Sequence, residues 1–211
     1  MSLVPQAKAQ DSNFQQQLDR HGVEYRIPPT GKAILVNIPA FELIAFDNGK
    51  PVLRSRIIVG APWTPTPIME TETTKVRFRP TWRPTPSMVR SGDYADRLWP
   101  PGENNPLGLA AIRLEEGLLD YLHDTNRRDL FERPDRALSH GCIRVEKWDV
   151  LIAWLLDMPL AQVHRLANGN RTIDIETPPV PVTLAYLRRF IDSDGRVQCH
   201  ADIYARQPGA C

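Results

Sequence analysis

Proline is the feature that most restricts what this chain can fold into. Twenty of its 211 residues are proline. Because proline fixes φ and has no backbone N–H, it belongs in turns, in loops and at the edges of sheets rather than inside helices. The prolines therefore argue against an all-α fold and favour a chain built mainly from strands.

Strand patterns begin soon after the N-terminus. Residues 33–38 and 41–46 are apolar and rich in β-branched side chains, and residues 51–59 continue the pattern. Between the last two runs lies Asp47-Asn48-Gly49-Lys50, a turn sequence in which glycine can take a positive φ. Three strand segments so close together predict an antiparallel meander.

Further strands and three helices follow from the same patterns. The clearest helix covers residues 146–156, where apolar side chains recur at helical spacing. A second helix extends to residues 168–169, and a short one from Ser12 to Gly22 has Phe14 and Leu18 on one face. Additional strands are predicted at 74–79, 118–123, 172–176, 183–191 and 196–204, the last two joined by a hairpin turn at 192–195.

These elements predict a mainly β fold: a β-sandwich of mixed sheets with a short helix pair and a long lid-like loop insertion. Residues 1–26 form an N-terminal tail and short helix, and residues 27–208 form one domain. Within it, residues 61–106 are rich in proline and carry Trp63, Trp82 and Trp99. Such a segment suits either a rigid lid over a groove or a surface excursion pinned by three buried tryptophans.

Composition excludes several classes of function. The chain is 42% hydrophobic and 24% charged, with a net charge of +1. Without a strong basic field, we expect no nucleic-acid partner. No run of 18 apolar residues is present, so we expect no transmembrane segment. The first residues have no apolar stretch and do not form an intact signal peptide.

The three cysteines are Cys142, Cys199 and Cys211. They form no CxxC pair and no zinc-ribbon spacing. Cys199 and Cys211 are close enough in sequence to form a disulfide in an exported protein, and the alternative is two free thiols. An odd count leaves Cys142 as the unpaired thiol if the other two are bridged.

Cys142 lies in Ser139-His140-Gly141-Cys142, a setting that suits a nucleophile. A thiol needs a neighbouring base, because the thiolate is the reactive form. His140 lies two residues away on the same segment and does not face the sulfur directly. His123 comes from a separate strand that can run beside Cys142. Gly141 permits a tight turn, so the amides of Gly141 and Cys142 could form an oxyanion hole.

Other interpretations of these residues remain open at this point. A lone buried cysteine is more often inert core than nucleophile, and a lone strand histidine is more often structural. The two histidines and Cys142 could also bind zinc, although no fourth ligand lies at motif spacing.

Together, these residues resemble the L,D-transpeptidase catalytic-domain family (YkuD-like). Its signature is a His, fourteen to seventeen residues, then Ser/Thr-His-Gly-Cys, an apolar residue and Arg or Asn. Here fifteen residues separate His123 from Ser139, and the motif continues through Ile143 to Arg144. The resemblance covers about residues 27–208 and is nearest to the larger periplasmic, lid-bearing members. The resemblance to these members extends to residues 36–41, 47–50, 106–108, 121–125, 130–133, 194–198 and 202–204.

The resemblance implies a role for each motif residue. Cys142 would be the acylated nucleophile and His123 the base, with its other ring nitrogen oriented by the backbone carbonyl of Asp124. Gly141 would supply an oxyanion donor together with Cys142. Arg144 would bind a substrate carboxylate, for which its fork is suited, the alternative being a structural ion pair. The substrate-binding residues would be Tyr121, Ser139, His140 and Arg144.

The resemblance also implies an activity and a location. The expected enzyme is a cysteine L,D-transpeptidase that acts on peptidoglycan stem peptides through a thioester acyl-enzyme and needs no metal or other cofactor. It would release D-Ala, form 3–3 cross-links or anchor a lipoprotein, be acylated by carbapenems, and be exported to the periplasm or cell wall.

Rival functions differ in what happens at Cys142. Hydrolysis of the same acyl-enzyme would make an L,D-carboxypeptidase. A non-catalytic peptidoglycan-binding module and a zinc-binding module keep the fold without the reaction. A papain-like peptidase would place its Cys before its His, and a sortase-like enzyme would want a longer gap between them; neither matches the order and spacing of His123 and Cys142.

Overall fold

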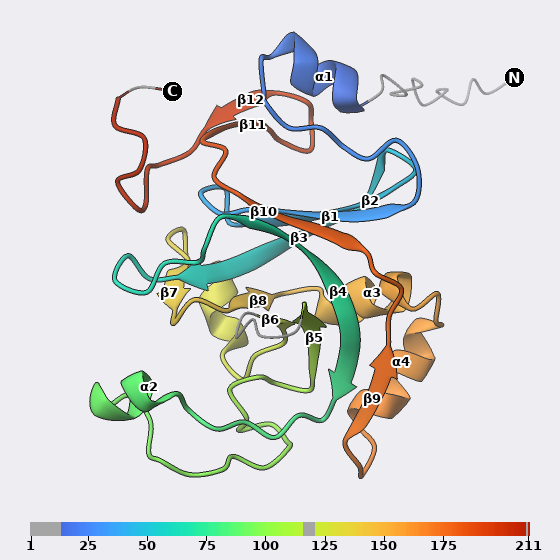
Figure 1. The fold of residues 1–211 in the computed structure, drawn as a ribbon, viewed down its shortest axis with the longest axis vertical. Coiled ribbons are helices and arrows are strands. Elements are labelled where there is room, and N and C mark those ends of the chain that lie inside the picture. The colour runs from blue at the N-terminus through green and yellow to red at the C-terminus, as the bar shows by residue number, and fades with distance from the viewer. Residues whose placement is uncertain (1–13, 116–120, 210) are drawn as a thin grey trace, which may run out of the picture.

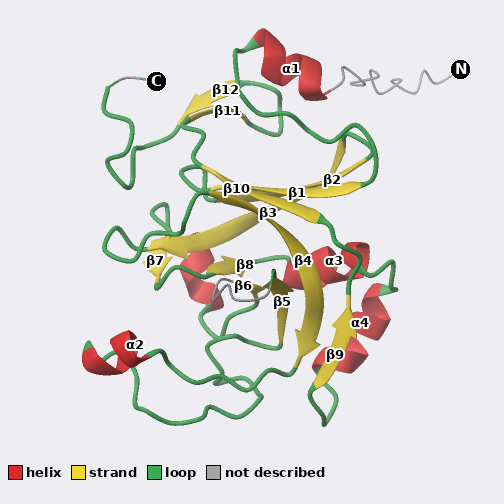
Figure 2. Ribbon diagram, in the orientation of Figure 1, coloured by secondary structure: helices red, strands yellow, loops and turns green. Residues whose placement is uncertain are grey.

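The computed structural model of the chain describes residues 14–115, 121–209 and 211. Figures 1 and 2 show a mainly β molecule with a few short helices. The helices are α1 Phe14–Arg20, α2 Pro86–Arg90, α3 Trp148–Leu155 and α4 Leu160–Ala167, with a 3-10 helix η1 at Arg128–Glu132. The strands are β1 Lys32–Asn37, β2 Glu42–Asp47, β3 Lys50–Gly60, β4 Met69–Phe78, β5 Ala110–Leu114, β6 Tyr121–His123, β7 Ala137–Ser139, β8 Ile143–Val145, β9 Ile173–Glu176, β10 Pro181–Ala185, β11 Arg189–Ile191 and β12 Val197–Cys199.

Within the described residues, ten strands form one mixed sheet that closes on itself. The strand order is β10-β1-β2-β3-β8-β6-β5-β4-β9, β7 pairs with β3, and β10 also pairs with β4. The β1–β10, β3–β7 and β6–β8 pairs are parallel, and the other pairs of this sheet are antiparallel. The predicted mainly β fold with mixed strand pairing is confirmed. The two layers of the predicted sandwich are parts of one curled sheet.

The predicted meander is formed by β1, β2 and β3. Its second turn holds Asn48 and Gly49 at φ of 49° and 76°, the conformation that a two-residue hairpin turn requires. Because this turn fixes the β2–β3 register locally, the meander could be recognised from sequence alone.

The main core fills the inside of the curled sheet, and the helix pair closes one end of it. On α3 the side chains of Trp148, Leu151, Ile152 and Leu155 are all buried, as their helical spacing predicts. Residues from β1, β3, β4, β5 and β8 meet them in the same apolar cluster. The core therefore supports the short strands β6 and β8.

A smaller apolar cluster lies on the outer side of β1 and β2. There Phe14 and Leu18 of α1 are buried, as predicted, against Phe46 and Phe190. The rings of Phe14 and Phe46 lie 5.6 Å apart. The proposed helix start at Ser12 lies outside the described residues. Figure 1 shows α1 and the β11–β12 hairpin together at the top of the molecule, away from β6 and β8.

Three sequence predictions need correction. The strand expected at 74–79 begins at Met69 and reaches Phe78, because it pairs with β5, β9 and β10 in turn. Residues 183–191 are not one strand: β10 ends at Ala185 and β11 begins at Arg189 in a separate two-stranded sheet with β12. Residues 200–204 are not part of a strand.

The irregular part of the lid-like insertion is thus shorter than predicted. We call residues 79–106, which follow β4, the lid segment. Its two ends are joined by backbone hydrogen bonds between Trp82 and Trp99, at 3.0 and 2.7 Å. Trp63 lies before β4 and is 81% exposed, so the picture of three buried tryptophans is wrong.

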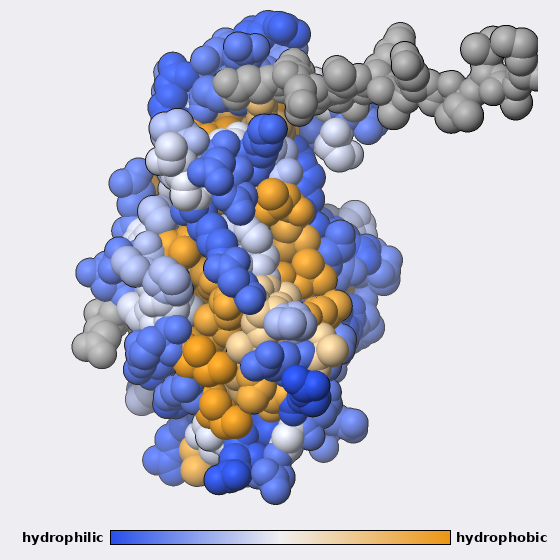
Figure 3. All heavy atoms as spheres, turned by 90° about the vertical axis from the view of Figure 1, so that its right-hand side faces the viewer, coloured by the Kyte–Doolittle hydropathy of each residue, from blue (hydrophilic) through white to orange (hydrophobic). Residues whose placement is uncertain are grey.

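Figure 3 faces the side that carries α3, α4 and β9, and apolar side chains form a band across it. In the part of the chain that the structure describes, no single helix is long and apolar enough to cross a membrane. Only α3 and α4 taken together reach that length and hydropathy, and they are bent by 115° at their junction.

Candidate active site

Parallel pairing of β6 with β8 brings the two motif segments together. In this register His123 lies opposite Arg144, and Cys142 directly precedes β8. His123, Ser139, His140, Cys142 and Arg144 line one small cavity. The predicted site residues therefore converge although fifteen residues of chain separate the two halves of the motif.

His123 is buried and neutral. Its side chain is only 4% exposed, and Nδ1 forms a short hydrogen bond with the carbonyl oxygen of Asp124. Burial, with the nearby Arg144 charge, lowers the pKa of His123 to about 3. Because a carbonyl oxygen only accepts, Nδ1 carries the ring proton and Nε2 keeps its lone pair. Nε2 is therefore the ring nitrogen that can accept a proton, and the low pKa makes it a weak base in the absence of substrate.

Asp124 is fixed by its surroundings. Its carboxylate accepts hydrogen bonds from the Leu109 amide at 3.0 Å and from Arg128 at 2.8 Å. The Gly108 backbone lies so close that a Cβ there would collide with this carboxylate. Burial raises the pKa of Asp124, against the opposing effect of these donors. The side chain thus immobilises the residue whose carbonyl orients His123.

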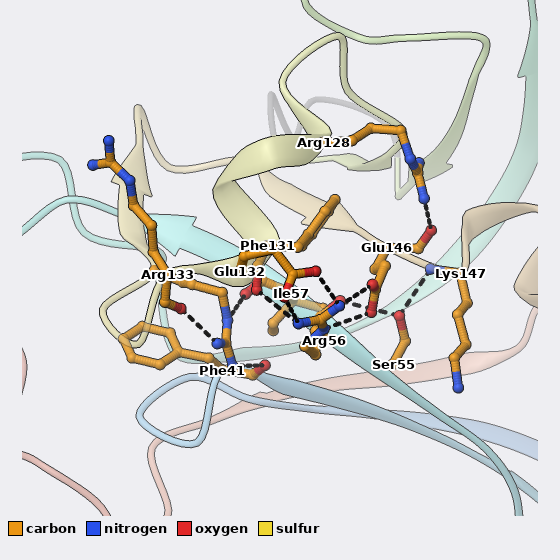
Figure 4. A network of polar contacts seen from close by, with 11 residues as sticks. Phe41, Ser55, Arg56, Ile57, Arg128, Phe131, Glu132, Arg133, Glu146 and Lys147 are labelled. Carbon is orange, nitrogen blue, oxygen red and sulfur yellow. Dashed lines mark hydrogen bonds and ion pairs between the residues drawn. The ribbon is translucent and has the colours of Figure 1, made fainter.

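Two arginines hold the end of β8, and Figure 4 shows the bonds that Arg56 and Arg128 make to Glu146. Arg128 donates to the Glu146 carbonyl oxygen at 2.8 Å as well as to Asp124. Arg56 of β3 binds the Glu146 carboxylate at 2.9 Å and the Glu132 carboxylate at 2.8 Å. The hydrogen bonds from Arg56 lower the pKa of Glu146. This network holds η1, β3 and β8 in a fixed relation around the site.

Residues 139–142 form a tight turn, here called the Cys142 turn. Cys142 is half-buried and lies outside any disulfide, whereas Cys199 and Cys211 are joined in one. Gly141 has a φ of 115°, which glycine adopts readily. The Ser139 hydroxyl donates to the Cys142 carbonyl at 2.6 Å and accepts from the Gly141 amide at 3.1 Å. Because the Gly141 amide is engaged within the turn, the Cys142 amide is the better candidate for an oxyanion donor.

The lid segment contacts the site through two adjacent side chains. Asp93 Oδ2 lies 3.0 Å from Nε2 of His140. The Tyr94 ring packs edge-on against His140 with centroids 6.0 Å apart, and its hydroxyl accepts a hydrogen bond from Arg144. The cavity that remains is about 30 Å³, the volume of about one water molecule. Little room is therefore left at Cys142 beside the lid segment.

Arg144 is a half-buried cation. No carboxylate in the described ranges forms an ion pair with it. Burial lowers its pKa, against the opposing effects of Cys142 nearby and of the hydrogen bond that Arg144 donates to Tyr94. A buried charge without a counter-ion is costly, so this guanidinium is suited to binding an anionic ligand.

Sequence reasoning missed part of the pocket. Besides the motif residues, the cavity is lined by Trp82, Met88, Tyr94, Pro106 and Leu107. They come from the lid segment and its end, and a loop leaves no periodic signal from which to place them. The side chain of Tyr121, predicted to bind substrate, lies outside the described residues. Among the described residues, no group of three or more His, Cys, Asp or Glu side chains could hold a metal ion.

Cys142, which lies outside the disulfide, and the buried imidazole of His123 line one cavity where β6 and β8 run side by side within the curled sheet. A thiol and an imidazole in one cavity can serve nucleophilic catalysis. Residues 31–171 match the family model of the L,D-transpeptidase catalytic domain (YkuD). The chain belongs to this family.

One curated relative and two solved structures are among the proteins to which this chain is similar. A curated Haemophilus influenzae protein with the provisional name of L,D-transpeptidase is 30% identical over 246 residues, covering 96% of this chain. The chain spans 50% of that relative's length. The L,D-transpeptidase from Mycobacterium smegmatis aligns with 73% of this chain and 58% of its own, at 15% identity and a TM-score of 0.48. The catalytic domain of the Enterococcus faecium L,D-transpeptidase aligns with 73% of this chain and 96% of its own, at 17% identity and a TM-score of 0.46.

Proposed function

We propose that this chain is a cysteine L,D-transpeptidase that acts on peptidoglycan stem peptides, with Cys142 as nucleophile and His123 as base. The observation that carries the proposal is the pairing of β6 with β8, which brings His123 into one cavity with Cys142, the cysteine that lies outside the disulfide. An imidazole that is already deprotonated can accept the thiol proton without first losing one of its own.

In the first half-reaction the Cys142 sulfur attacks the carbonyl of the third stem residue. His123 takes the thiol proton through Nε2, and the carbonyl oxygen becomes an oxyanion at the Cys142 amide. When the intermediate collapses, the C–N bond to D-Ala breaks and His123 returns the proton to the leaving amine. A thioester between Cys142 and the stem remains.

In the second half-reaction an amine attacks the thioester and the Cys142 thiol is regenerated. The side-chain amine of a second stem would give a 3–3 cross-link, and a lipoprotein lysine would give an anchored protein. Water would give net L,D-carboxypeptidase activity. Because the closed lid segment leaves so little space, it favours exclusion of water from the thioester.

Arg144 would bind a carboxylate of the stem. Its half-buried charge has no acidic partner among the described residues, and its planar fork accepts a carboxylate through two hydrogen bonds. Ser139 braces the Cys142 turn, and His140 contacts Asp93 of the lid segment. Both side chains also line the cavity and would contact the bound stem. Acting on peptidoglycan would place the protein outside the cytoplasm, in the periplasm or at the cell wall.

Defined muropeptides test the proposal. Incubation with a tetrapeptide stem should release D-Ala and yield a cross-linked dimer, with the acyl-enzyme visible by intact-mass spectrometry. Cys142→Ala should abolish all three products while leaving the thermal unfolding midpoint near that of the wild type. A tripeptide product without dimer would assign hydrolysis instead. Release of D-Ala by the Cys142→Ala protein would contradict the assignment of Cys142 as nucleophile. The absence of any carbapenem adduct on the wild type would also contradict the proposed function.

A further inference from the structure

The loop that follows β3 lies directly against the Cys142 turn. We call residues 61–66 the anchoring loop. Thr66 at its end is fully buried. The Thr66 hydroxyl accepts a hydrogen bond from the Gly60 amide at 2.9 Å and donates to the Gly141 carbonyl oxygen at 2.7 Å. Because a hydroxyl has one proton, accepting from Gly60 directs that proton to Gly141.

Thr66 itself has little freedom to move. Its amide donates to the Tyr204 hydroxyl at 3.2 Å, and that hydroxyl donates to the Gly60 carbonyl oxygen at 2.6 Å. The backbone of Gly60 packs so closely that a Cβ there would lie 2.7 Å from the Thr66 nitrogen. Segments 60–66 and the C-terminal region thus hold the Thr66 hydroxyl at one place.

The hydrogen bond from Thr66 to the Gly141 carbonyl oxygen also fixes the direction of the N–H that follows it. A trans peptide unit is planar, so its C=O and the following N–H point in opposite directions, and the described residues contain no cis peptide. Holding the Gly141 oxygen toward Thr66 therefore turns the Cys142 N–H to the other side. Glycine alone would not ensure this, because it has no Cβ to restrict rotation of the peptide plane.

We propose that Thr66 is a positioning residue that orients the Cys142 amide as oxyanion donor for acyl transfer. The inference rests on the proposed function. The anchoring loop lies far from Cys142 in sequence. Through Thr66 it would set the direction of the Cys142 N–H. Ser139 bonds to the carbonyl that follows this peptide unit, that of Cys142, whereas the Thr66 hydroxyl bonds to the peptide unit that carries the donor.

Two reactions of the Cys142 sulfur can distinguish orientation of the Cys142 N–H by Thr66 from general stabilisation of the Cys142 turn. Acylation by a muropeptide or a carbapenem generates an oxyanion, whereas alkylation by iodoacetamide displaces iodide without one. Thr66→Val keeps the approximate shape and removes the hydroxyl. We expect its acylation rate constant to fall about 10- to 100-fold, less than the full loss of an oxyanion donor of about 10²–10³. Its alkylation rate should stay within about twofold of the wild type, since no oxyanion forms.

Matched variants complete the experiment. Thr66→Ser keeps the hydroxyl and should restore acylation. Thr64→Val removes a comparable bond from the same loop, to the Ser139 carbonyl at 3.0 Å, and should leave the ratio of acylation to alkylation unchanged. If Thr66→Val does not fold, Tyr204→Phe, which releases the Thr66 backbone, is compared by the same ratio.

The outcomes are distinct. A selective loss of acylation that Thr66→Ser restores supports the proposal. Equal loss of both reactions, or acylation by Thr66→Val within about twofold of the wild type, overturns it, because an oxyanion donor contributes far more than that. If the wild-type protein is alkylated but never acylated, the proposed function fails, which is a different result.

Discussion

At the scale of single residues, the burial of His123 has a measurable cost in acid. Its pKa in the folded chain is lowered to about 3, whereas an unfolded histidine titrates near pH 6.5. Below about pH 6.5 the unfolded state therefore binds a proton that the folded state does not. The stability that His123 contributes is complete above about pH 6.5 and is lost progressively as the pH falls toward 3.

This linkage predicts a difference between the wild type and His123→Gln. The wild-type unfolding free energy should carry an added pH dependence that approaches about 1.4 kcal/mol per pH unit. The glutamine variant lacks the titrating ring and should show a shallower slope. Urea unfolding between about pH 5 and pH 7 measures both slopes within the relevant window. Identical slopes would mean that His123 is not held neutral.

Arg128 contacts the residue whose carbonyl orients His123, so its substitution should slow acylation. Arg128→Met removes the cation from the buried Asp124 carboxylate and breaks the link to Glu146. Orientation of His123 by the Asp124 carbonyl should weaken, and acylation should fall about three- to tenfold, a modest effect because Arg128 is itself half exposed.

The neighbouring Arg127 provides the control. Arg127 and its partner Asp129 are both more than half exposed, so Arg127→Met should leave the acylation rate within about twofold of the wild type. Equal effects of the two substitutions on acylation would show that positive charge at or beside η1, and not the contact with Asp124, sets the acylation rate. Stopped-flow or mass-spectrometric acylation kinetics distinguish these results.

The motif residues were found from sequence through the resemblance to a family signature, whose spacing His123 and Cys142 match. Thr66 contacts a backbone carbonyl 75 residues away, and Arg128 contacts the Glu146 carbonyl from η1. Neither residue belongs to the motif, and a threonine or an arginine by itself gives no sign of such a partner. Neither could therefore be assigned a role before the structure.

At the scale of elements, the lid segment is held on the site by an exposed contact. Asp93 pairs with His140 at 3.0 Å, and the hydrogen bonds from Ser91 and His140 lower the pKa of Asp93. Asp93→Asn weakens this contact and should increase the open population. Labelling of Cys142 by a bulky maleimide should speed up about two- to fivefold, the range that a surface ion pair typically supports.

Asp96→Asn is a suitable comparison on the same segment. Asp96 faces Arg83 at 3.8 Å with both side chains 66% exposed, and it makes no contact with the motif residues among the interactions described. Its labelling rate should match the wild type. If Asp93→Asn also labels at the wild-type rate, the Asp93–His140 contact does not hold the lid segment closed.

Elements were predictable where local sequence decides them. The β2–β3 hairpin follows from its turn, and α3 from its four buried apolar side chains. The length of β4 does not, because prolines on both sides suggest a loop while pairing with three other strands extends it to Met69. The break between β10 and β11 is also set by partners: β10 continues beside β1, and only β11 turns away to pair with β12.

At the scale of the whole molecule, the ring of strands is closed by a late segment of the chain. β10 pairs with β1 through residues 34–37 and with β4 through residues 69–72. This strand lies outside the residues 31–171 that match the family model. Val182 and Leu184 of β10 are buried in the main core, so the folding unit must extend past the region that the family model covers.

A truncated chain tests this extension. A fragment of residues 31–171 lacks β9 and β10, leaves the edges of β1 and β4 unpaired, and exposes the core face that Val182 and Leu184 cover. Burial of two such side chains contributes about 3–6 kcal/mol, a large share of the 5–15 kcal/mol that stabilises an ordinary domain. We expect this fragment to aggregate or to show no cooperative thermal transition. A fragment of residues 14–211 retains both strands and should unfold cooperatively. Cooperative unfolding of the shorter fragment, followed by circular dichroism, would mean that β10 is an addition to a ring that is stable without it.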